Sequence, residues 1–175
     1  MNLRTIDIDQ FFCHSFTLWK EKWMLLTAGS LESMKFNSMT ISWGSLGYIW
    51  NKPFVQVAVR PSRLTFQYIN DYADFTLCIF PEKYRKQMQN LGSKSGREMD
   101  KINRSGFTPV KAYMTSAPAF EEAELVIECR KIYWQDLDAD HLLDMGILSN
   151  YPRGDFHRIF FGEILAVQGT EEYLS

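Results

Sequence analysis

The sequence predicts a mainly β fold, a β-barrel with a few short helices, and three observations carry this prediction. Six separate runs are rich in β-branched, aromatic and aliphatic residues, as strands are. Aromatic residues make up 15% of the 175 residues, and flat rings favour pleated sheets. Leu125, Ile127 and Cys129 alternate with residues that include Glu128 and Arg130, as in an antiparallel strand with one packed face and one wet face.

Each predicted strand comes from a run of its own, and the last run carries a sign of curvature. Gly162 interrupts that run between Phe161 and Glu163, where a bulge or a sharp bend would let the sheet curl toward closure. A barrel is therefore favoured over an open sheet. The predicted strands cover 23–30, 38–43, 54–59, 75–80, 123–134 and 157–167.

Three short helices are predicted between the strands, and we expect them to close the ends of the barrel. The first covers 62–69 and begins with Ser62 as its cap. The second begins at Pro81 and covers 81–92, with apolar residues recurring on one helical face before Gly92 ends it. The third covers 95–106 and has the spacing of a capping box at its start.

Composition places the chain among folded cytoplasmic proteins of one domain, residues 1–175. Apolar residues make up 46% and charged residues 23%, as in globular proteins. The formal net charge of -2 disfavours nucleic acid and anionic membranes as partners. Cys13, Cys78 and Cys129 are far apart and odd in number, which favours a reducing cytosol. The beginning of the chain lacks the apolar core of a signal peptide, and no apolar stretch reaches membrane-spanning length.

Motifs for metal-dependent or acyl-transfer chemistry are absent from the sequence. His14, His141 and His157 are isolated from one another. There is no Cys-x-x-Cys, no His-Glu-x-x-His and no Gly-x-Ser-x-Gly. We therefore expect no metal site and no nucleophilic hydrolase.

Residues 60–65 form the strongest candidate for an anion site. The segment Arg-Pro-Ser-Arg-Leu-Thr follows a predicted strand and opens a predicted helix, whose N-terminus exposes unpaired backbone N–H groups. Two guanidinium groups and two hydroxyl groups would add to these donors, so the corner suits a phosphate monoester. An equally weighted alternative is that Ser62 only caps the helix and that the arginines are solvated.

A second segment, 92–97, is a glycine-bracketed turn that carries Lys94 and leads into the third predicted helix. The segment therefore predicts a second anion contact. The glycines do not stand at the spacing of a nucleotide triphosphatase loop, so we reject that class.

Residues 37–44 begin as a strand with a small polar residue at every second position. Alternation puts Ser38, Thr40 and Ser42 on one face, where short side chains leave room for a flat ring. The alternative is a wet edge strand.

Eight short segments, taken in order and spacing, resemble the flavin reductase-like family and in particular its flavoredoxin branch. Together they extend over roughly residues 20–167, nearly the whole chain. The segments are Thr-Ala-Gly-Ser at 27–30, Asn-Ser-Met-Thr-Ile-Ser-Trp-Gly at 37–44, Asn-Lys-Pro at 51–53, Arg-Pro-Ser-Arg at 60–63, Gly-Ser-Lys-Ser-Gly at 92–96, Glu-Cys-Arg-Lys at 128–131, Asp-Phe-His-Arg at 155–158 and Gly-Glu-Ile at 162–164.

The resemblance implies an FMN-binding split β-barrel with its cofactor at a homodimer interface. The phosphate would be held by Arg60, Ser62, Arg63 and Thr65, assisted by Lys94. The flavin ring would lie along Asn37, Ser38, Met39, Thr40, Ser42 and Trp43, with Ser93, Ser95 and Gly96 lining the other side. Hydride transfer between a nicotinamide and the flavin needs positioning more than an acid or base, which fits the absence of a catalytic dyad.

His157 is the one candidate catalytic residue. Related short-chain flavin reductases often carry Gly-Asp-His before the last strand, near the nicotinamide, but here Phe156 stands between Asp155 and His157. A shift of one residue turns a side chain to the other strand face. A nicotinamide contact and a surface or core histidine therefore remain equal alternatives.

The resemblance implies an FMN-dependent oxidoreductase that uses NAD(P)H or a redox partner protein. A flavin carrier without turnover and a pyridoxamine-phosphate oxidase-like protein remain alternatives, whereas a barrel for single-stranded nucleic acid is disfavoured by the acidic charge balance. Loops 112–118 and 148–155 are expected to set the substrate. Trp19 and Tyr151 are candidate ring contacts, although aromatic packing alone would explain each.

Overall fold

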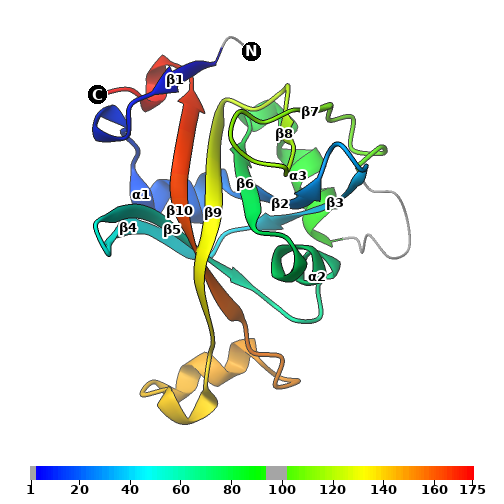
Figure 1. The fold of residues 1–175 in the computed structure, drawn as a ribbon. Coiled ribbons are helices and arrows are strands. Elements are labelled where there is room, and N and C mark those ends of the chain that lie inside the picture. The colour runs from blue at the N-terminus through cyan, green and yellow to red at the C-terminus, as the bar shows by residue number, and fades with distance from the viewer. Residues whose placement is uncertain (1–2, 94–101) are drawn as a thin grey trace.

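A computed structural model describes residues 3–93 and 102–175 of the chain (Figure 1). Its main feature is a sheet in which each pair of neighbouring strands is antiparallel, in the order β3-β2-β6-β9-β10-β5-β4, with β1 paired to β10. A small second sheet pairs β7 with β8. The strands are β1 Arg4–Ile6, β2 Met24–Ser30, β3 Lys35–Ile41, β4 Gly44–Ile49, β5 Lys52–Val59, β6 Asp74–Ile79, β7 Pro109–Val110, β8 Ala119–Phe120, β9 Leu125–Asp136 and β10 Arg158–Gly169.

The connection between β3 and β4 forces this sheet to curl. These two strands are the opposite ends of the strand order, yet only Ser42 and Trp43 separate them in the chain. The sheet must therefore bend round until its ends meet, and the backbone N–H of Ala58 in β5 donates to the carbonyl of Trp43 at 3.3 Å. β3 and β5 both lie in the described part of the chain, and no ladder of backbone hydrogen bonds joins them. The predicted β-barrel is confirmed, as a barrel with one open seam.

The six predicted strands correspond to β2, β3, β5, β6, β9 and β10. The strand predicted over 38–43 begins earlier, at Lys35, and ends at Ile41, because Ser42 and Trp43 form the connection to β4. The sequence prediction missed β4, which reads Gly-Ser-Leu-Gly-Tyr-Ile. Its two glycines weaken the strand signal, and pairing of all six β4 residues with residues 52–57 of β5 overrides that weakness.

The predicted irregularity at Gly162 is confirmed. The register between β9 and β10 shifts between Phe161 and Gly162, which is a bulge. A Cβ atom at Gly162 would lie 2.5 Å from the Cζ atom of Phe75 and 2.8 Å from the Cβ atom of Cys129. The barrel interior thus has no room for a side chain at this point of β10.

Buried apolar side chains form two layers, one inside the barrel and one outside it. The inner layer includes Leu26, Phe75, Ile127 and Phe160, and each is fully buried. Full burial of one such side chain contributes about 1.5–3 kcal/mol. The outer layer covers the far face of β2, β6 and β9 and consists of Leu25, Cys78, Phe80, Met88, Leu91, Ile102, Phe107, Ala112, Ala119, Phe120, Ala123 and Val126.

The helices differ from the predictions in where they begin and end. The first is α2, Leu64–Asp71, and Ser62 is not its cap: Arg63 stands at the N-cap with extended backbone and without a side-chain capping bond. The second begins with a 3₁₀ turn after Pro81 and continues as α3, Arg85–Ser93, so Gly92 does not end it. The further short elements are η1 Ile8–Gln10, α1 Ser15–Thr17, η2 Leu18–Lys22, η3 Glu82–Tyr84, η4 Ala139–His141, η5 Met145–Asn150 and η6 Glu171–Tyr173.

The helices also differ in what they cover. Ile69 of α2 packs into the inner layer, so α2 closes one end of the barrel as predicted. In contrast, Met88 and Leu91 of α3 pack in the outer layer, against the outside of the sheet.

The third predicted helix is only partly visible, because its first residues, 95–101, lie outside the described residues. From Ile102 to Gly106 the chain forms turns instead of a helix. The hydroxyl of Ser105 donates to the carbonyl of Ile102 at 2.6 Å and accepts from the N–H of Phe107 at 3.1 Å. A serine that bonds its neighbouring backbone in this way competes with helix formation.

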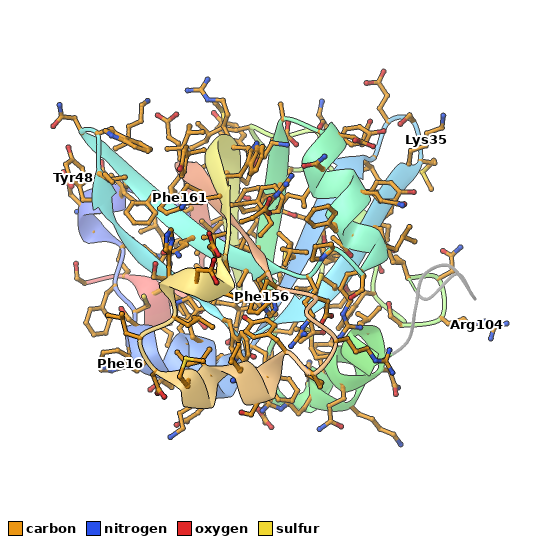
Figure 2. All side chains as sticks on the ribbon, turned by 90° about the horizontal axis from the view of Figure 1, so that it is seen from below. Phe16, Lys35, Tyr48, Arg104, Phe156 and Phe161 are labelled. Carbon is orange, nitrogen blue, oxygen red and sulfur yellow. The ribbon has the colours of Figure 1, made fainter. Side chains whose placement is uncertain are left out.

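The β9–β10 connection, residues 137–157, projects beyond the barrel (Figure 1). Seen from below, it lies in front of the barrel, with Phe156 near the centre of the view and Phe16 and Tyr48 at its rim (Figure 2). We call this connection the arm. Among the described residues, no helix has the length and hydropathy needed to cross a membrane.

Candidate functional site

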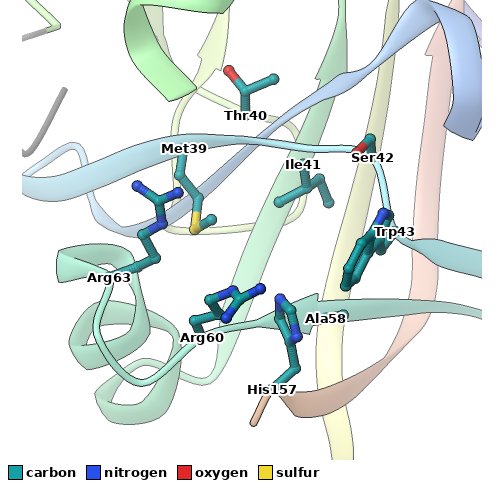
Figure 3. Close-up of a pocket in the computed structure, with 9 residues that line it drawn as sticks. All are labelled: Met39, Thr40, Ile41, Ser42, Trp43, Ala58, Arg60, Arg63 and His157. Atoms are coloured by element: carbon teal, nitrogen blue, oxygen red, sulfur yellow. The ribbon is translucent and has the colours of Figure 1, made fainter. Parts of the chain in front are cut away.

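A pocket of about 160 Å³ opens at the seam of the barrel, where the end of β3 approaches the end of β5 (Figure 3). β3 is hydrogen-bonded to β2 along its whole length, and β5 is hydrogen-bonded to β4 on one side and to β10 on the other. The site is therefore built on strands whose positions the core fixes. It is lined by Met39, Thr40, Ile41, Ser42, Trp43, Ala58, Arg60, Arg63 and His157.

The side chains of β3 do not face the pocket in the way that the sequence suggested. Met39, Ile41 and Trp43 point to the side of Arg60 and His157, whereas Thr40 and Ser42 point away (Figure 3). The hydroxyl of Thr40 instead donates to the carbonyl of Met88 in α3 at 2.6 Å. The predicted alternation is present, but the face with the hydroxyl groups is the outer one.

Three of the proposed contact residues lie behind the pocket wall and have structural partners. The side-chain amide of Asn37 donates to the hydroxyl of Thr65 at 2.6 Å, and both residues are buried. The hydroxyl groups of Ser38 and Thr27 lie 2.7 Å apart across the β2–β3 ladder. The bond between Asn37 and Thr65 ties the first turn of α2 to β3, and so it fixes the helix N-terminus beside the pocket.

Arg60 is already engaged within the chain. Its guanidinium donates to Asp155 Oδ1 at 2.8 Å and to the carbonyl of Asn150 at 2.8 Å, and it lies 5.0 Å from the ring centre of Tyr151. The hydrogen bond from Arg60 lowers the pKa of Asp155. Ser62, which is exposed, contacts the other oxygen of Asp155 at 3.4 Å. Arg60 thus fastens the end of the arm to the pocket, and its charge is largely compensated.

Among the described residues, Arg63 is the cation that remains available at this corner. It donates to the carbonyl of Gly92 at 3.3 Å, and within residues 3–93 and 102–175 no carboxylate forms an ion pair with it. It stands at the N-cap of α2, where unpaired N–H groups and the helix dipole add positive potential. A phosphate group suits this corner because the charge and the donors are fixed before it binds.

His157 lies at the pocket, and the one-residue shift does not turn it away. It precedes β10, it is buried, and its ring centre lies 5.1 Å from that of Trp43. Its Nδ1 atom lies 2.8 Å from the hydroxyl oxygen of Tyr151. Burial, the largest cause, and the guanidinium of Arg60 lower the pKa of His157 to about 4. The imidazole is therefore neutral at pH 7.

The lowered pKa of His157 predicts acid sensitivity of the fold. The folded pKa lies below the ordinary value of about 6.5, so the unfolded chain binds this proton more readily. The resulting stability is fully present above pH 6.5 and is lost as the pH falls toward about 4. Urea unfolding at pH 7, 6 and 5 should show a smaller loss of stability for His157→Gln than for the unchanged protein. Equal losses in both proteins would contradict this account.

Several other sequence expectations concern residues that lie elsewhere in the fold or outside the described residues. Ser93 ends α3, and Lys94, Ser95 and Gly96 lie outside the described residues. Trp19 is buried in the inner layer and would meet any side chain placed at Gly44, so it is a core residue. The loop 112–118 lies on the outer face of the sheet, where its backbone N–H groups bind Glu128 and Asp74.

The sequence analysis missed two pocket residues, Ile41 and Ala58. Both are apolar residues at or near the ends of strands, and no local signal distinguishes Ala58 from a core residue. Ile41 shares a strand face with Met39, so the alternation that was applied to the hydroxyl groups could have indicated it. Among the described residues, no group of three or more His, Cys, Asp or Glu side chains could hold a metal ion.

The donor set of the pocket fits one part of an FMN molecule. A phosphate would meet Arg63 and the α2 N-terminus, and a flat ring would meet the backbone of β3 and the ring of Trp43. Pockets for molecules of this size typically measure about 300–1,000 Å³. One chain therefore encloses less than a whole flavin nucleotide.

Comparison with known proteins identifies a matching family and similar solved structures. A sequence model of the flavin reductase like domain matches residues 22–174. Flavoredoxin from Methanosarcina acetivorans is 26% identical, with a TM-score of 0.66 over 97% of this chain and 76% of that chain. Flavoredoxin of Desulfovibrio vulgaris (Miyazaki F) is 23% identical, with a TM-score of 0.66 over 86% and 70%. An FMN-binding domain of a flavin reductases-like enzyme from Shewanella baltica is 13% identical, with a TM-score of 0.69 over 99% and 85%. The split-barrel-like fold is shared with these proteins.

Proposed function

Because this chain belongs to the flavin reductase-like family of flavin-related oxidoreductases, we propose that it binds FMN at the seam pocket and transfers electrons between NAD(P)H and flavin or a redox partner. The observation that carries the proposal is the basic N-terminus of α2 at the open seam, with Arg63 unpaired by any carboxylate in the described ranges. A flavin supplies the hydride chemistry when it is bound.

The residues of the chain then have the task of holding and shielding the cofactor. Arg63 and the first N–H groups of α2 bind the phosphate, and Lys94 is the further cation that we assign to it. The edge of β3 opposite β2, from Met39 to Ile41 and on to Ser42 beyond the strand, offers backbone groups to the polar edge of the ring. Trp43, half exposed, offers a face on which a ring can stack and exclude water.

We extend the proposal to a homodimer that completes the pocket. The volume of about 160 Å³ leaves part of an FMN molecule uncovered by one chain. The arm presents large apolar side chains to solvent, with exposed fractions of 99% at Leu143 and 63% at Met145. Large exposed apolar surfaces often mark a contact with another protein, and here we assign them to the second copy.

The double substitution Leu143→Asp with Met145→Asp is expected to shift the mass in light scattering from dimer to monomer and to weaken FMN binding. Charged side chains cannot be buried in an apolar contact without a large desolvation cost. Met34→Asp, which changes an exposed side chain in the β2–β3 turn, is the matched control and should leave both properties unchanged. A monomer that retains FMN fully would disprove the shared site.

We also propose that the protein is located in the cytoplasm. Cys13, Cys78 and Cys129 are free thiols, as expected in a reducing compartment. Burial raises the pKa of Cys78 to about 12, so that thiol is inert. Cell fractionation, with the protein expected in the soluble cytoplasmic fraction, tests this assignment.

The proposed activity is tested by visible absorbance of the purified protein after addition of FMN and desalting. Flavin bands that remain, and that bleach with NADH or NADPH under exclusion of oxygen, would support a reductase. Bands that no nucleotide bleaches would point to a carrier or to a flavoredoxin reduced by a partner protein. Complete loss of flavin on desalting would refute a tightly bound FMN.

A further inference from the structure

Tyr151 is a buried residue of the arm that contacts two residues of the pocket lining, His157 through its hydroxyl and Arg60 through its ring. It is 7% exposed, and its hydroxyl oxygen lies 2.8 Å from Nδ1 of the imidazole. The two rings meet edge to face, with centres 5.5 Å apart. Tyr151 does not line the pocket, so any effect on a ligand must pass through these neighbours, and the hydrogen bond to His157 is the more directional of the two contacts.

The direction of this hydrogen bond follows from counting donors. A neutral imidazole carries one N–H, which stands on Nδ1 or on Nε2. If Nδ1 carried the hydrogen, it would donate to the phenol oxygen, and the phenol hydrogen would then need an acceptor of its own. Nδ1 is the one hydrogen-bond partner of the Tyr151 hydroxyl within the described residues. Buried polar hydrogens are nearly always bonded, and donation to Nδ1 satisfies the phenol hydrogen within the protein, which favours the phenol as the donor.

The second nitrogen of the ring therefore carries the hydrogen and faces the pocket. In Figure 3 the imidazole of His157 rises between Arg60 and Trp43 toward β3. Trp43 packs against one side of the ring, and Tyr151 holds its Nδ1 atom. The imidazole consequently has little freedom to rotate, and its Nε2–H has a defined direction.

We infer that Tyr151 is a positioning residue that fixes His157 in the Nε2–H form, so that the pocket offers a neutral hydrogen-bond donor to an acceptor atom of the bound ligand. The ligand atom is a carbonyl oxygen or an unprotonated ring nitrogen, the acceptors that a flavin or a nicotinamide amide presents. This inference gives His157 the role of a donor and excludes it as a general acid or base. It rests on the proposed function for the identity of the ligand, but not for the state of the imidazole.

The charges around the ring agree with a donor that does not titrate near pH 7. The groups that face His157 are the guanidinium groups of Arg60 and Arg63, the carboxylate of Asp155 and the phenol of Tyr151. Burial and the two guanidinium groups oppose protonation, and only the carboxylate favours it. Burial also raises the pKa of Tyr151, so the phenol keeps its hydrogen.

The state of the imidazole is tested first, on flavin-free protein, by nitrogen-15 NMR of the histidine side chains at pH 7. The signal of His157 is identified by its loss in His157→Gln. The expected result is an unprotonated Nδ1 and a protonated Nε2, changing in Tyr151→Phe to a mixture of both forms. Tyr133→Phe, an exposed tyrosine that bonds Gln135, is the control and should leave the signal unchanged. A protonated Nδ1 in the unchanged protein would overturn the inference.

The role of the donor is tested with FMN and NADPH as probes. His157→Gln keeps an N–H donor that cannot titrate, whereas His157→Ala removes the donor. We expect hydride-transfer rates within about threefold of the original for glutamine, and FMN affinity or rate lowered about tenfold for alanine. In Tyr151→Phe, the loss of FMN affinity or of hydride-transfer rate should lie between the losses of these two variants. The pH profile of the rate should change little. A glutamine variant as impaired as the alanine variant, with an altered pH profile, would assign acid or base catalysis to His157 and overturn the inference.

The two tests separate this inference from the proposed function. If the unchanged protein binds no FMN, the proposed function fails, while the NMR result still decides whether Tyr151 fixes the imidazole. If FMN binds and the expected tautomer is absent, the proposed function stands and the inference fails.

Discussion

The charge reversal Arg63→Glu is expected to weaken FMN binding about 100-fold, because about 3 kcal/mol of charge-assisted hydrogen bonding to the phosphate is lost. Arg63 is the strongest candidate for this contact. Arg60, the other guanidinium of the corner, is bound to Asp155 and to the carbonyl of Asn150. The carboxylate introduced by the substitution would also repel the phosphate at the positive end of α2. Fluorescence titration of FMN measures the dissociation constant.

The control for this substitution is Arg4→Glu. Arg4 lies on β1, away from α2 in Figure 1, and its exposed ion pair with Glu171 contributes little to stability. FMN affinity should be unchanged in this variant. If Arg4→Glu weakened FMN binding as much as Arg63→Glu, only the overall charge would matter, and the phosphate site at α2 would be wrong. Raising the salt concentration should weaken binding in the unchanged protein more than in the Arg63 variant.

Substitution of Glu128 with alanine is expected to lower the free energy of unfolding by about 3–5 kcal/mol, because the substitution removes the acceptor that several donors of one loop share. Glu128 is fully buried on β9. Its oxygens accept from the N–H groups of Tyr113, Met114 and Thr115 at 2.9, 2.6 and 3.0 Å, and from the Thr115 hydroxyl at 3.1 Å. Without it, these donors lose their partner on the outer face of the sheet.

Urea unfolding at pH 7 measures this effect, and Glu32→Ala serves as the control. Glu32 is exposed in the turn between β2 and β3, where loss of a carboxylate should change stability by less than about 0.5 kcal/mol. A loss below about 1 kcal/mol for Glu128→Ala would show that the loop finds other acceptors. Because the loop 112–118 does not line the pocket, FMN affinity should change little in the folded variant.

The comparison of sequence and structure is informative at particular residues. Gly162 was predicted as the point of curvature, and the bulge is there, because glycine inside a strand is a local and specific signal. The basic corner at 60–65 was predicted to open a helix, and α2 begins there, one residue beyond Arg63. In contrast, β4 was missed, because glycine is unfavourable in strands and the strand depends on its pairing with β5.

The sequence by itself determined the strand runs, the antiparallel character and the helix that opens at a basic corner, because these depend on residues that are neighbours in the chain. Only the tertiary structure decided which charges remain available. Arg60 is compensated by Asp155, 95 residues further along, while Arg63 is not paired with a carboxylate in the described ranges. It also decided that the hydroxyl of Thr40 faces α3 and that Tyr151 fixes His157. The physical reason is that alternation tells which residues share a strand face, but the curl of the whole sheet decides what each face meets.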